Sequence, residues 1–417
     1  MITFRMLTII TCAVAIQSGC KHPTEPPKVT KPLVADAGID QTVNVGNYVV
    51  LDGTKSSGNV GDSLTYQWTS LSTDRRIFVA GSDRPISWCG FTRSGVFRFS
   101  LVVGNNTSKS PADTVVVTVE GRKQSVFLDP SLELLIRKSL GVPSADLTTQ
   151  MLESLAAVPP MVYWVDSLQN LSGIEYCRNL SELHLSLKCI KDISPLANLV
   201  KLKKLTLDQN NAIQDISPLS HLTQLEQLDL FVNNISDVSP LAGLTNLKYL
   251  DISANPVTNI SVLENLTSME QILAFQAHVG SLAFVANWKN LNLLWFDMCE
   301  VTDISALSGL TNLTYVELWR NQIVDISALA NLKKLSYLNL SQNSVSDISP
   351  LLSLVNLSQI RLDGNKISDL SPLVNNSGMG SGDILDITAN PLSQQSINEY
   401  LPALLARGVT IIRLFKK

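Results

Sequence analysis

The stretch "LTYVELWRNQIVDISALANLKK", Leu313–Lys334, is one copy of a 22-residue pattern that fills more than half of this 417-residue chain. Apolar residues stand 0, 3, 5, 10, 13, 16 and 19 positions along it, and an asparagine, Asn321, stands 8 positions along it. A fixed period of this length predicts a solenoid in which each repeat forms one coil. The units begin at Val158, Leu180, Leu202, Leu225, Leu247, Met269, Leu291, Leu313, Leu335 and Leu357.

The pattern also predicts which way each side chain points. The apolar start of each unit predicts a short strand, and stacked coils place these strands in one parallel sheet. Because side chains alternate along a strand, offsets 3 and 5 face the core and offsets 2, 4 and 6 face outward. The asparagine at offset 8 is expected to bond unpaired backbone groups where the chain leaves the strand, as in leucine-rich repeats. Cys299 stands at this offset in one unit, so we interpret it as a structural substitute for asparagine.

The outward positions hold many large aromatic residues. In one unit they expose Glu317 and Trp319, and in the preceding unit Trp295 and Asp297. Since neighbouring strands lie about 4.8 Å apart, the aromatic residues of successive coils form one surface. Acidic and polar residues border it: Asp208, Asp229, Asp251, Asp297, Glu317, Asn339, Arg361 and Asp363. An aromatic centre inside a polar rim is typical of protein-binding sites. The residues predicted to bind a ligand on this concave face are Tyr249, Phe275, Trp295, Asp297, Tyr315, Glu317, Trp319 and Tyr337.

An alternative concerns the coil "QILAFQAHVG", which spans residues 271–280. Ala274 occupies a core position there, which fits an irregular coil in which inside and outside are locally exchanged. Under this alternative, Leu273 and Leu293 are not part of a binding surface. Single exposed aromatic residues are also common in repeat proteins.

The sequence predicts no catalytic residues, no metal site and no cofactor. The four histidines are scattered, no CxxC pair occurs, and no nucleophile stands with a general base. Aspartates recur at offset 12 with a spacing that suits a calcium ladder. We interpret them instead as caps that accept backbone N–H bonds at the start of short helical turns. They are Asp192, Asp237, Asp303, Asp325, Asp347 and Asp369.

The N-terminus has the features of an export signal. Arg5 precedes the apolar run "MLTIITCAVAI", which is too short for a membrane span and is typical of a signal-peptide core. The run leads into "QSGC", which resembles the lipobox of bacterial lipoproteins and departs from it at Gln17. The resemblance implies a signal peptide over 1–19, lipidation of Cys20 and a proline-rich spacer over 20–32. The alternative is ordinary cleavage near Ser18–Gly19, which releases a free secreted protein.

Residues 33–121 predict a β-sandwich. Short alternating stretches such as "SLTYQWTSL" and "GVFRFSLVVG" are separated by Gly, Asn and Asp turns. These stretches, with "ADAGIDQTVNVGNYVVLDG" and "ADTVVVTV", resemble the polycystic-kidney-disease (PKD) type of immunoglobulin-like domain. The resemblance implies that Trp68 is the buried core tryptophan and that the domain is a spacer or an accessory binding unit.

The remaining chain divides into a helical N-terminal cap (125–157), the repeats (158–378), and a degenerate last repeat with a C-terminal cap (379–417). The 22-residue length and the phrase "DISPLANL", which recurs as "DVSPLAGL" and "DISALSGL", resemble the internalin-type repeats of bacterial surface proteins. In internalins the immunoglobulin-like module follows the repeats, whereas here it precedes them. The predicted fold class is therefore a β-sandwich followed by a right-handed leucine-rich-repeat solenoid with helical caps.

These predictions together favour a binding protein over an enzyme. A net charge of −4 argues against nucleic acid as a partner. We expect a lipid-anchored adhesion or binding protein at the outer membrane or cell surface, whose concave face takes a protein partner, with a host receptor as one candidate. The alternative is a glycan-binding accessory protein, because aromatic residues beside carboxylates also suit sugars.

Overall fold

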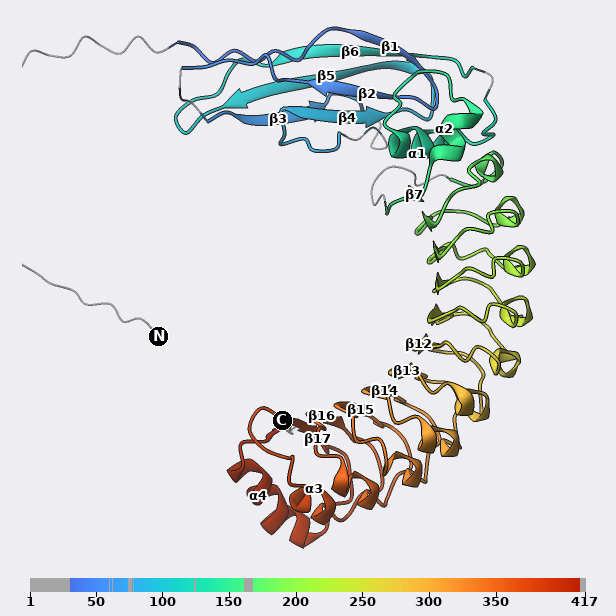
Figure 1. Cartoon of the computed structure of the whole chain (residues 1–417). Helices are drawn as coiled ribbons and strands as arrows, with labels where there is room; N and C mark the ends of the chain where they lie inside the picture. The colour runs from blue at the N-terminus through green and yellow to red at the C-terminus, as the bar shows by residue number, and fades with distance from the viewer. Residues whose placement is uncertain are drawn as a thin grey trace, which may run out of the picture.

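The computed structural model describes residues 31–412 except 60, 62, 74–76, 78, 124 and 161–167. The predicted signal peptide, the lipidation site Cys20 and most of the predicted spacer lie outside the described residues. Within the described residues, the chain forms a β-sandwich and then a solenoid whose coils curve into an arc (Figure 1).

The β-sandwich contains the first six strands. Four of them form a sheet in the order β1-β6-β5-β3, and the other two pair as β2-β4. Trp68 is buried in its core and its Nε1–H donates to the carbonyl of Arg84 at 3.1 Å. The prediction of an immunoglobulin-type sandwich is confirmed. Its strands are β1 (Gln41–Asn44), β2 (Tyr48–Asp52), β3 (Thr65–Ser70), β4 (Ile86–Gly90), β5 (Gly95–Gly104) and β6 (Asp113–Glu120).

The solenoid contains one parallel sheet of twelve strands in chain order. Figure 1 shows these strands along the inner side of the arc and the short helical turns along its outer side. The predicted solenoid with a concave parallel sheet is confirmed. The strands are β7 (Ala157–Val158), β8 (Glu182–His184), β9 (Lys204–Thr206), β10 (Gln227–Asp229), β11 (Tyr249–Asp251), β12 (Gln271–Leu273), β13 (Leu293–Trp295), β14 (Tyr315–Glu317), β15 (Tyr337–Asn339), β16 (Gln359–Arg361), β17 (Ile384–Asp386) and β18 (Thr410–Ile412).

The convex side is built from 3-10 turns, and in most coils an aspartate precedes the turn. In these coils the aspartate Oδ1 accepts the backbone N–H two residues later at 2.8 Å, as in Asp325 with Ser327. This is the capping role predicted for them. The turns are η1 (Ile174–Tyr176), η2 (Ser194–Leu196), η3 (Ser217–Leu219), η4 (Ser239–Leu241), η5 (Ile260–Leu263), η6 (Ala283–Asn287), η7 (Ser305–Gly309), η8 (Ser327–Leu329) and η9 (Ser349–Ser353).

Helices close both ends of the solenoid core. Asp129 caps the first of them by accepting the N–H of Ser131 at 2.8 Å, and Gly141 ends it in the left-handed conformation. At the other end the closing helices are followed by β18, which adds one strand beyond the last repeat. The helices are α1 (Pro130–Leu140), α2 (Thr149–Ser154), α3 (Ser371–Asn375), the π-helical turn η10 (Ser396–Tyr400) and α4 (Leu401–Ala406).

The strand register is continuous through the coil that the sequence left ambiguous. Ile272 pairs with Leu250 on one side and with Leu294 on the other. Ala274 is fully buried, whereas Leu273 is half-buried on the concave face. The alternative of an irregular coil with exchanged faces is therefore wrong.

The asparagines at offset 8 bond the backbone as predicted. Asn321 Oδ1 accepts the N–H groups of Cys299 and Val301, both at 3.0 Å. Its Nδ2 donates to the carbonyls of Phe296, at 2.8 Å, and Leu318, at 3.0 Å. Each such side chain satisfies backbone groups of two coils, which fixes the point where the strand ends.

The β-sandwich packs directly on α1. The backbone N–H of Tyr48 donates to the carbonyl of Pro143 at 3.3 Å. The Lys138 ammonium lies 3.5 Å from the centre of the Trp88 ring, and burial lowers the pKa of Lys138. A side chain at Gly90 would collide with Leu134, so glycine lets β4 approach the helix closely.

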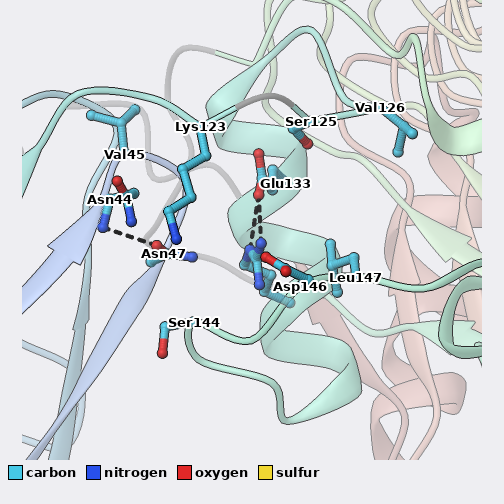
Figure 2. Close-up of a pocket in the computed structure, with 11 residues that line it drawn as sticks. Asn44, Val45, Asn47, Lys123, Ser125, Val126, Glu133, Ser144, Asp146 and Leu147 are labelled. Carbon is cyan, nitrogen blue, oxygen red and sulfur yellow. Dashed lines mark hydrogen bonds and ion pairs between the residues drawn. The ribbon is translucent and has the colours of Figure 1, made fainter.

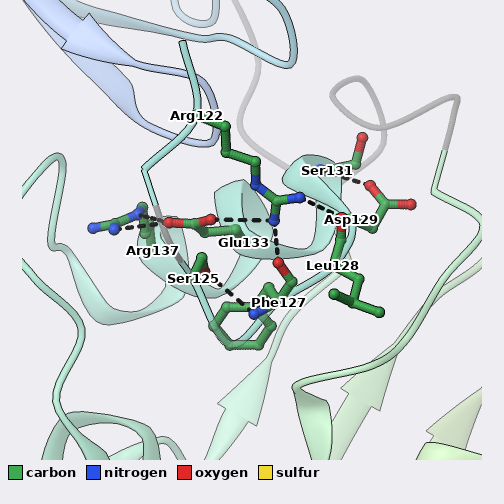
Figure 3. A network of polar contacts seen from close by, with 8 residues as sticks. All are labelled: Arg122, Ser125, Phe127, Leu128, Asp129, Ser131, Glu133 and Arg137. Atoms are coloured by element: carbon green, nitrogen blue, oxygen red, sulfur yellow. Dashed lines mark hydrogen bonds and ion pairs between the residues drawn. The ribbon is translucent and has the colours of Figure 1, made fainter.

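The centre of this junction is the buried carboxylate of Glu133 (Figure 3). Its Oε1 accepts a hydrogen bond from Arg137 Nε at 2.9 Å, and Arg137 Nη2 lies 2.8 Å away. Arg122, on the segment that leaves the sandwich, reaches within 3.5 Å of its Oε2. Arg122 also donates to the carbonyls of Phe127 and Leu128. The carboxylate thus joins the cap helix to the chain that enters it.

A polar cavity of about 490 Å³ adjoins Glu133 (Figure 2). Its walls come from the β1–β2 turn with Asn44 and Asn47, from Lys123, and from the loop with Asp146. Glu133 Oε2 is buried and accepts no hydrogen bond from a described residue. The cavity therefore places polar groups beside the apolar contacts through which the sandwich and the cap helix meet.

Candidate functional site on the concave face

A shallow depression of about 510 Å³ lies on the concave face over β13 to β17. Six of the eight residues predicted to bind a ligand line it, and we call it the aromatic depression. These six residues are Trp295, Asp297, Tyr315, Glu317, Trp319 and Tyr337. The remaining lining residues are polar or charged: Asn339, Ser341, Arg361, Asp363 and Asp386.

Aromatic and acidic side chains alternate along and across two neighbouring strands. Trp295 ends β13 and Asp297 follows it, whereas Glu317 ends β14 and Trp319 follows it. The register places Trp295 beside Glu317. Each carboxylate therefore has a tryptophan next to it on its own strand and on the neighbouring one. This arrangement follows from the 22-residue period, because the order of the two residue types is reversed between the two units.

The carboxylates hold the aromatic rings in place. Asp297 Oδ2 accepts a hydrogen bond from Trp295 Nε1 at 2.7 Å, and its Oδ1 accepts the backbone N–H of Trp319 at 2.7 Å. Glu317 Oε2 accepts the hydroxyl of Tyr337 at 2.7 Å and that of Tyr315 at 3.3 Å.

The rings themselves form a wall. Tyr315 and Tyr337 stack with centroids 4.1 Å apart and planes 4° apart. Trp295 lies 6.5 Å from Tyr315 at an angle of 43°. Offset and tilted arrangements of this kind stabilise aromatic clusters and keep their rings rigid. The depression is therefore a preorganised surface with fixed ring faces.

The prediction that Asp297 and Glu317 are exposed is wrong. Both point out of the sheet, but they are only 6% and 4% exposed. Side chains on a concave surface converge, so the larger tryptophans and tyrosines cover the shorter carboxylates. The aromatic residues are half-buried rather than free in solvent.

Burial changes the protonation of these acids. Burial, with the neighbouring Glu317 carboxylate second, raises the pKa of Asp297 to about 7. Burial also raises the pKa of Glu317. The pKa values of Tyr315 and Tyr337 are raised for the same reason, so their hydroxyls stay protonated as donors.

Two of the predicted residues lie outside the depression. Tyr249 and Phe275 are half-buried on the same face, on coils nearer the N-terminal end. Tyr249 stands beside a second acidic group, in which burial raises the pKa of Asp229 to about 6 and also that of Asp251. The structure thus separates the predicted surface into two areas.

Sequence reasoning missed two residues of the depression. Asp386 belongs to the last repeat, where the asparagine at offset 8 is Asn390, so the register alone could have placed it on the concave face. Ser341 stands at the outward offset 6, but its small side chain did not mark it as a binding residue. It is 2% exposed, and its hydroxyl has no hydrogen-bond partner among the described residues.

Cys299 has the structural role that was predicted for it. Its Sγ lies 2.9 Å from the carbonyl oxygen of Ala274 and 3.2 Å from that of Asp297, where asparagine bonds the backbone in other coils. Burial raises the pKa of its thiol to about 12, which keeps it protonated. The sequence left open a bridge between Cys177 and Cys189, and Cys177 is a buried free thiol here.

Comparison with known proteins places this fold in a family. A leucine-rich-repeat family model matches residues 178–221, 223–265 and 333–375, and a PKD domain model matches residues 37–119. The crystal structure of internalin InlF from Listeria monocytogenes is 30% identical, with 70% of this chain and 92% of that chain covered and a TM-score of 0.57. This chain belongs to the internalin-like leucine-rich-repeat family.

A second internalin is also similar to this chain in sequence. Internalin C2 of Listeria monocytogenes is 32% identical, with 57% of this internalin-like protein and 94% of that chain covered and a TM-score of 0.44. No curated protein matches the sequence. Among the described residues, no helix is both long and apolar enough to cross a bilayer. The PKD-like domain is the part by which this internalin-like protein departs from the order of modules expected for internalins.

The raised pKa of Asp297 predicts a pH dependence of stability in this internalin-like protein. Between the ordinary value of 3.8 and the folded value of about 7, the folded state binds a proton that the unfolded chain does not. Stability therefore falls as pH rises from about 4 to about 7 and levels off above 7. We expect the free energy of unfolding to be about 1 kcal/mol lower at pH 8 than at pH 6 because of Asp297.

Urea denaturation of the wild type and of Asp297→Asn at pH 6 and pH 8 measures this effect. The difference between the two pH values should be about 1 kcal/mol smaller in the variant. Asp229 also makes stability fall as pH rises. Burial lowers the pKa of His184, so His184 makes stability rise with pH. Comparing the variant with the wild type removes both contributions. An equal pH difference in the two proteins would contradict the prediction.

Proposed function

We propose that this protein is a surface binding protein that uses the aromatic depression on its concave face to bind a protein partner. Solenoids use extended concave surfaces for binding, and the likeness to internalins supports a surface protein of that kind. The observation that carries the proposal is the wall of three aromatic rings, Trp295, Tyr315 and Tyr337, above buried carboxylates. Trp319 lines the same depression. Clustered aromatic side chains with a polar rim are the usual composition of binding hot spots.

The proposed attachment to a membrane is a lipid on Cys20. The lipobox-like "QSGC" supports it, and the spacer and the β-sandwich would then hold the concave face away from the bilayer. Adhesion to another cell, with a host receptor as one candidate, rests on the likeness to internalins alone.

A glycan partner is the second candidate, and the stacked faces of Tyr315 and Tyr337 favour it. The carboxylates argue against it. All four oxygens of Asp297 and Glu317 already accept hydrogen bonds from this chain, so they are poorly placed to bind sugar hydroxyls. The same engagement makes them unsuited to acid–base catalysis, which is why the proposal is a binding scaffold rather than an enzyme.

A binding screen tests the proposal. The chain from residue 21 onward would be assayed against arrayed surface-protein ectodomains and glycans, beside the double variant Trp295→Ala/Trp319→Ala. We expect a protein partner whose affinity falls about 100-fold in the double variant, because each anchoring aromatic contributes about 2 kcal/mol and such contributions are not fully additive. Circular dichroism would confirm that the variant is folded.

Two controls locate the effect. Leu352→Ala removes an apolar side chain that is 46% exposed on the convex side, and it should leave binding unchanged. Tyr249→Ala/Phe275→Ala tests whether the partner extends along the face beyond the depression. A glycan lost in the tryptophan variant would favour the second candidate. A partner that binds the folded tryptophan variant as well as the wild type would refute the proposed site.

A further inference from the structure

The two carboxylates beneath the aromatic depression accept their hydrogen bonds from neutral groups. Asp297 accepts its hydrogen bonds from an indole N–H and a backbone N–H. Glu317 accepts its hydrogen bonds from two tyrosine hydroxyls and from the Asn339 amide. Arg361 lines the same depression and opposes the rise that burial causes in the pKa of Glu317. A further cation placed over the pair would favour the charged forms of both acids.

The rest of the concave face also carries mainly negative charge. From β9 to β17 the outward positions carry seven carboxylates and two cationic groups, Lys204 and Arg361. Such a field favours a positively charged partner and accelerates its approach. The carboxylates are Asp208, Asp229, Asp251, Asp297, Glu317, Asp363 and Asp386.

The lining chemistry of the depression suits a cation more than an apolar anchor. Aromatic faces attract ammonium and guanidinium groups, and tryptophan does so most strongly. Trp319 already has one such neighbour, since the Arg320 guanidinium lies 5.9 Å from its ring centroid.

We infer that the aromatic depression binds a basic side chain, lysine or arginine, which a protein partner inserts against the tyrosine stack and the two tryptophans. The inference rests on the proposed function and names the chemistry of the partner. Asp363 and Asp386 at the rim contact the charged end of that side chain, whereas the rings contact its apolar stem. A partner with a basic loop or strand edge fits this surface.

Fluorine NMR of the full chain from residue 21 onward, labelled with 5-fluorotryptophan, tests the inference without a known partner. The signals of Trp295 and Trp319 would be assigned with Trp295→Phe and Trp319→Phe. The probes are the capped peptides Gly-Ser-Arg-Ser-Gly and Gly-Ser-Lys-Ser-Gly. Their matched neutral counterparts contain citrulline and acetyl-lysine.

Both basic peptides are expected to shift the two signals saturably in the millimolar range, with the neutral peptides at least tenfold weaker. The buried Trp288 provides an internal reference that should not move. Asp363→Asn/Asp386→Asn should weaken the basic peptides at least threefold, whereas Asp229→Asn, outside the depression, should not. The ratio of the arginine and lysine affinities shows which side chain is preferred.

Citrulline binding within threefold of arginine, or no shift of either tryptophan by tens of millimolar basic peptide, would overturn the inference. These outcomes are distinct from a failure of the proposed function. A screened protein partner that needs Trp295 and Trp319 but binds through a neutral residue would leave the function standing and refute the cation. A partner that binds without Trp295 and Trp319 would refute the proposed function. The peptide titrations would then still test whether the depression binds a cation.

Discussion

Replacing Asn321 with alanine is expected to lower the free energy of unfolding by about 4 kcal/mol. The substitution removes the side chain that follows the end of β14. It leaves two backbone N–H groups and the carbonyl of Phe296 in the preceding coil without partners, whereas the carbonyl of Leu318 keeps its bond from Asn343. A buried polar group that loses its partner costs about 1–3 kcal/mol, and water can reach only part of this site. The same strand end positions Trp319, whose carbonyl also accepts a bond from Asn321 at 3.3 Å. Stability and the shape of the aromatic depression should therefore change together.

The neighbouring coil supplies the matched control. Cys299 occupies the equivalent position, and Cys299→Asn restores the side chain that most coils have there. We expect its free energy of unfolding to stay within about 1 kcal/mol of the wild type, because the sulfur contacts that it replaces are weak. Urea denaturation followed by circular dichroism compares the two variants. A loss below about 1 kcal/mol in Asn321→Ala would show that the ladder of asparagines is not what fixes the coil ends.

Replacing Glu133 with alanine is expected to cost about 3 kcal/mol and to loosen the junction between the β-sandwich and the solenoid. Glu133 is 4% exposed, and its removal leaves the buried Arg137 without its carboxylate partner at 2.8 Å. Breaking one side of a buried ion pair is strongly destabilising, because the remaining charge stays away from water. The turn at Gly46 packs against the same carboxylate, so its contact is lost as well.

Urea denaturation measures the stability, and small-angle X-ray scattering measures the arrangement of the two domains. The double variant Glu133→Leu/Arg137→Met removes both charges and should recover most of the loss. Arg122→Ala, whose side chain is partly exposed, should have a smaller effect than Glu133→Ala. An unchanged stability and scattering curve in Glu133→Ala would mean that apolar contacts such as Leu134 on Gly90 hold the junction alone.

The repeat period predicted the solenoid and the face of every concave residue. Each coil contacts mainly its neighbours, so an offset within the unit fixes a strand position, as for Trp295 and Trp319. The same local logic predicted the backbone bonds of Asn321, the role of Cys299 and the caps at the start of the convex turns. The outward offsets alone gather six of the residues that line the aromatic depression.

Only the tertiary structure decided how deep those residues lie and what they contact. The burial of Asp297 and Glu317 depends on the size of side chains on adjacent coils of a curved sheet, which no single unit contains. The unpartnered hydroxyl of Ser341 and the contact of Glu133 with the β-sandwich arise in the same way, from residues that are distant in sequence. A repeating pattern predicts which way a side chain points, because that depends only on its position along the strand. Its burial and its charge partners depend on neighbours that the chain brings together only when it folds.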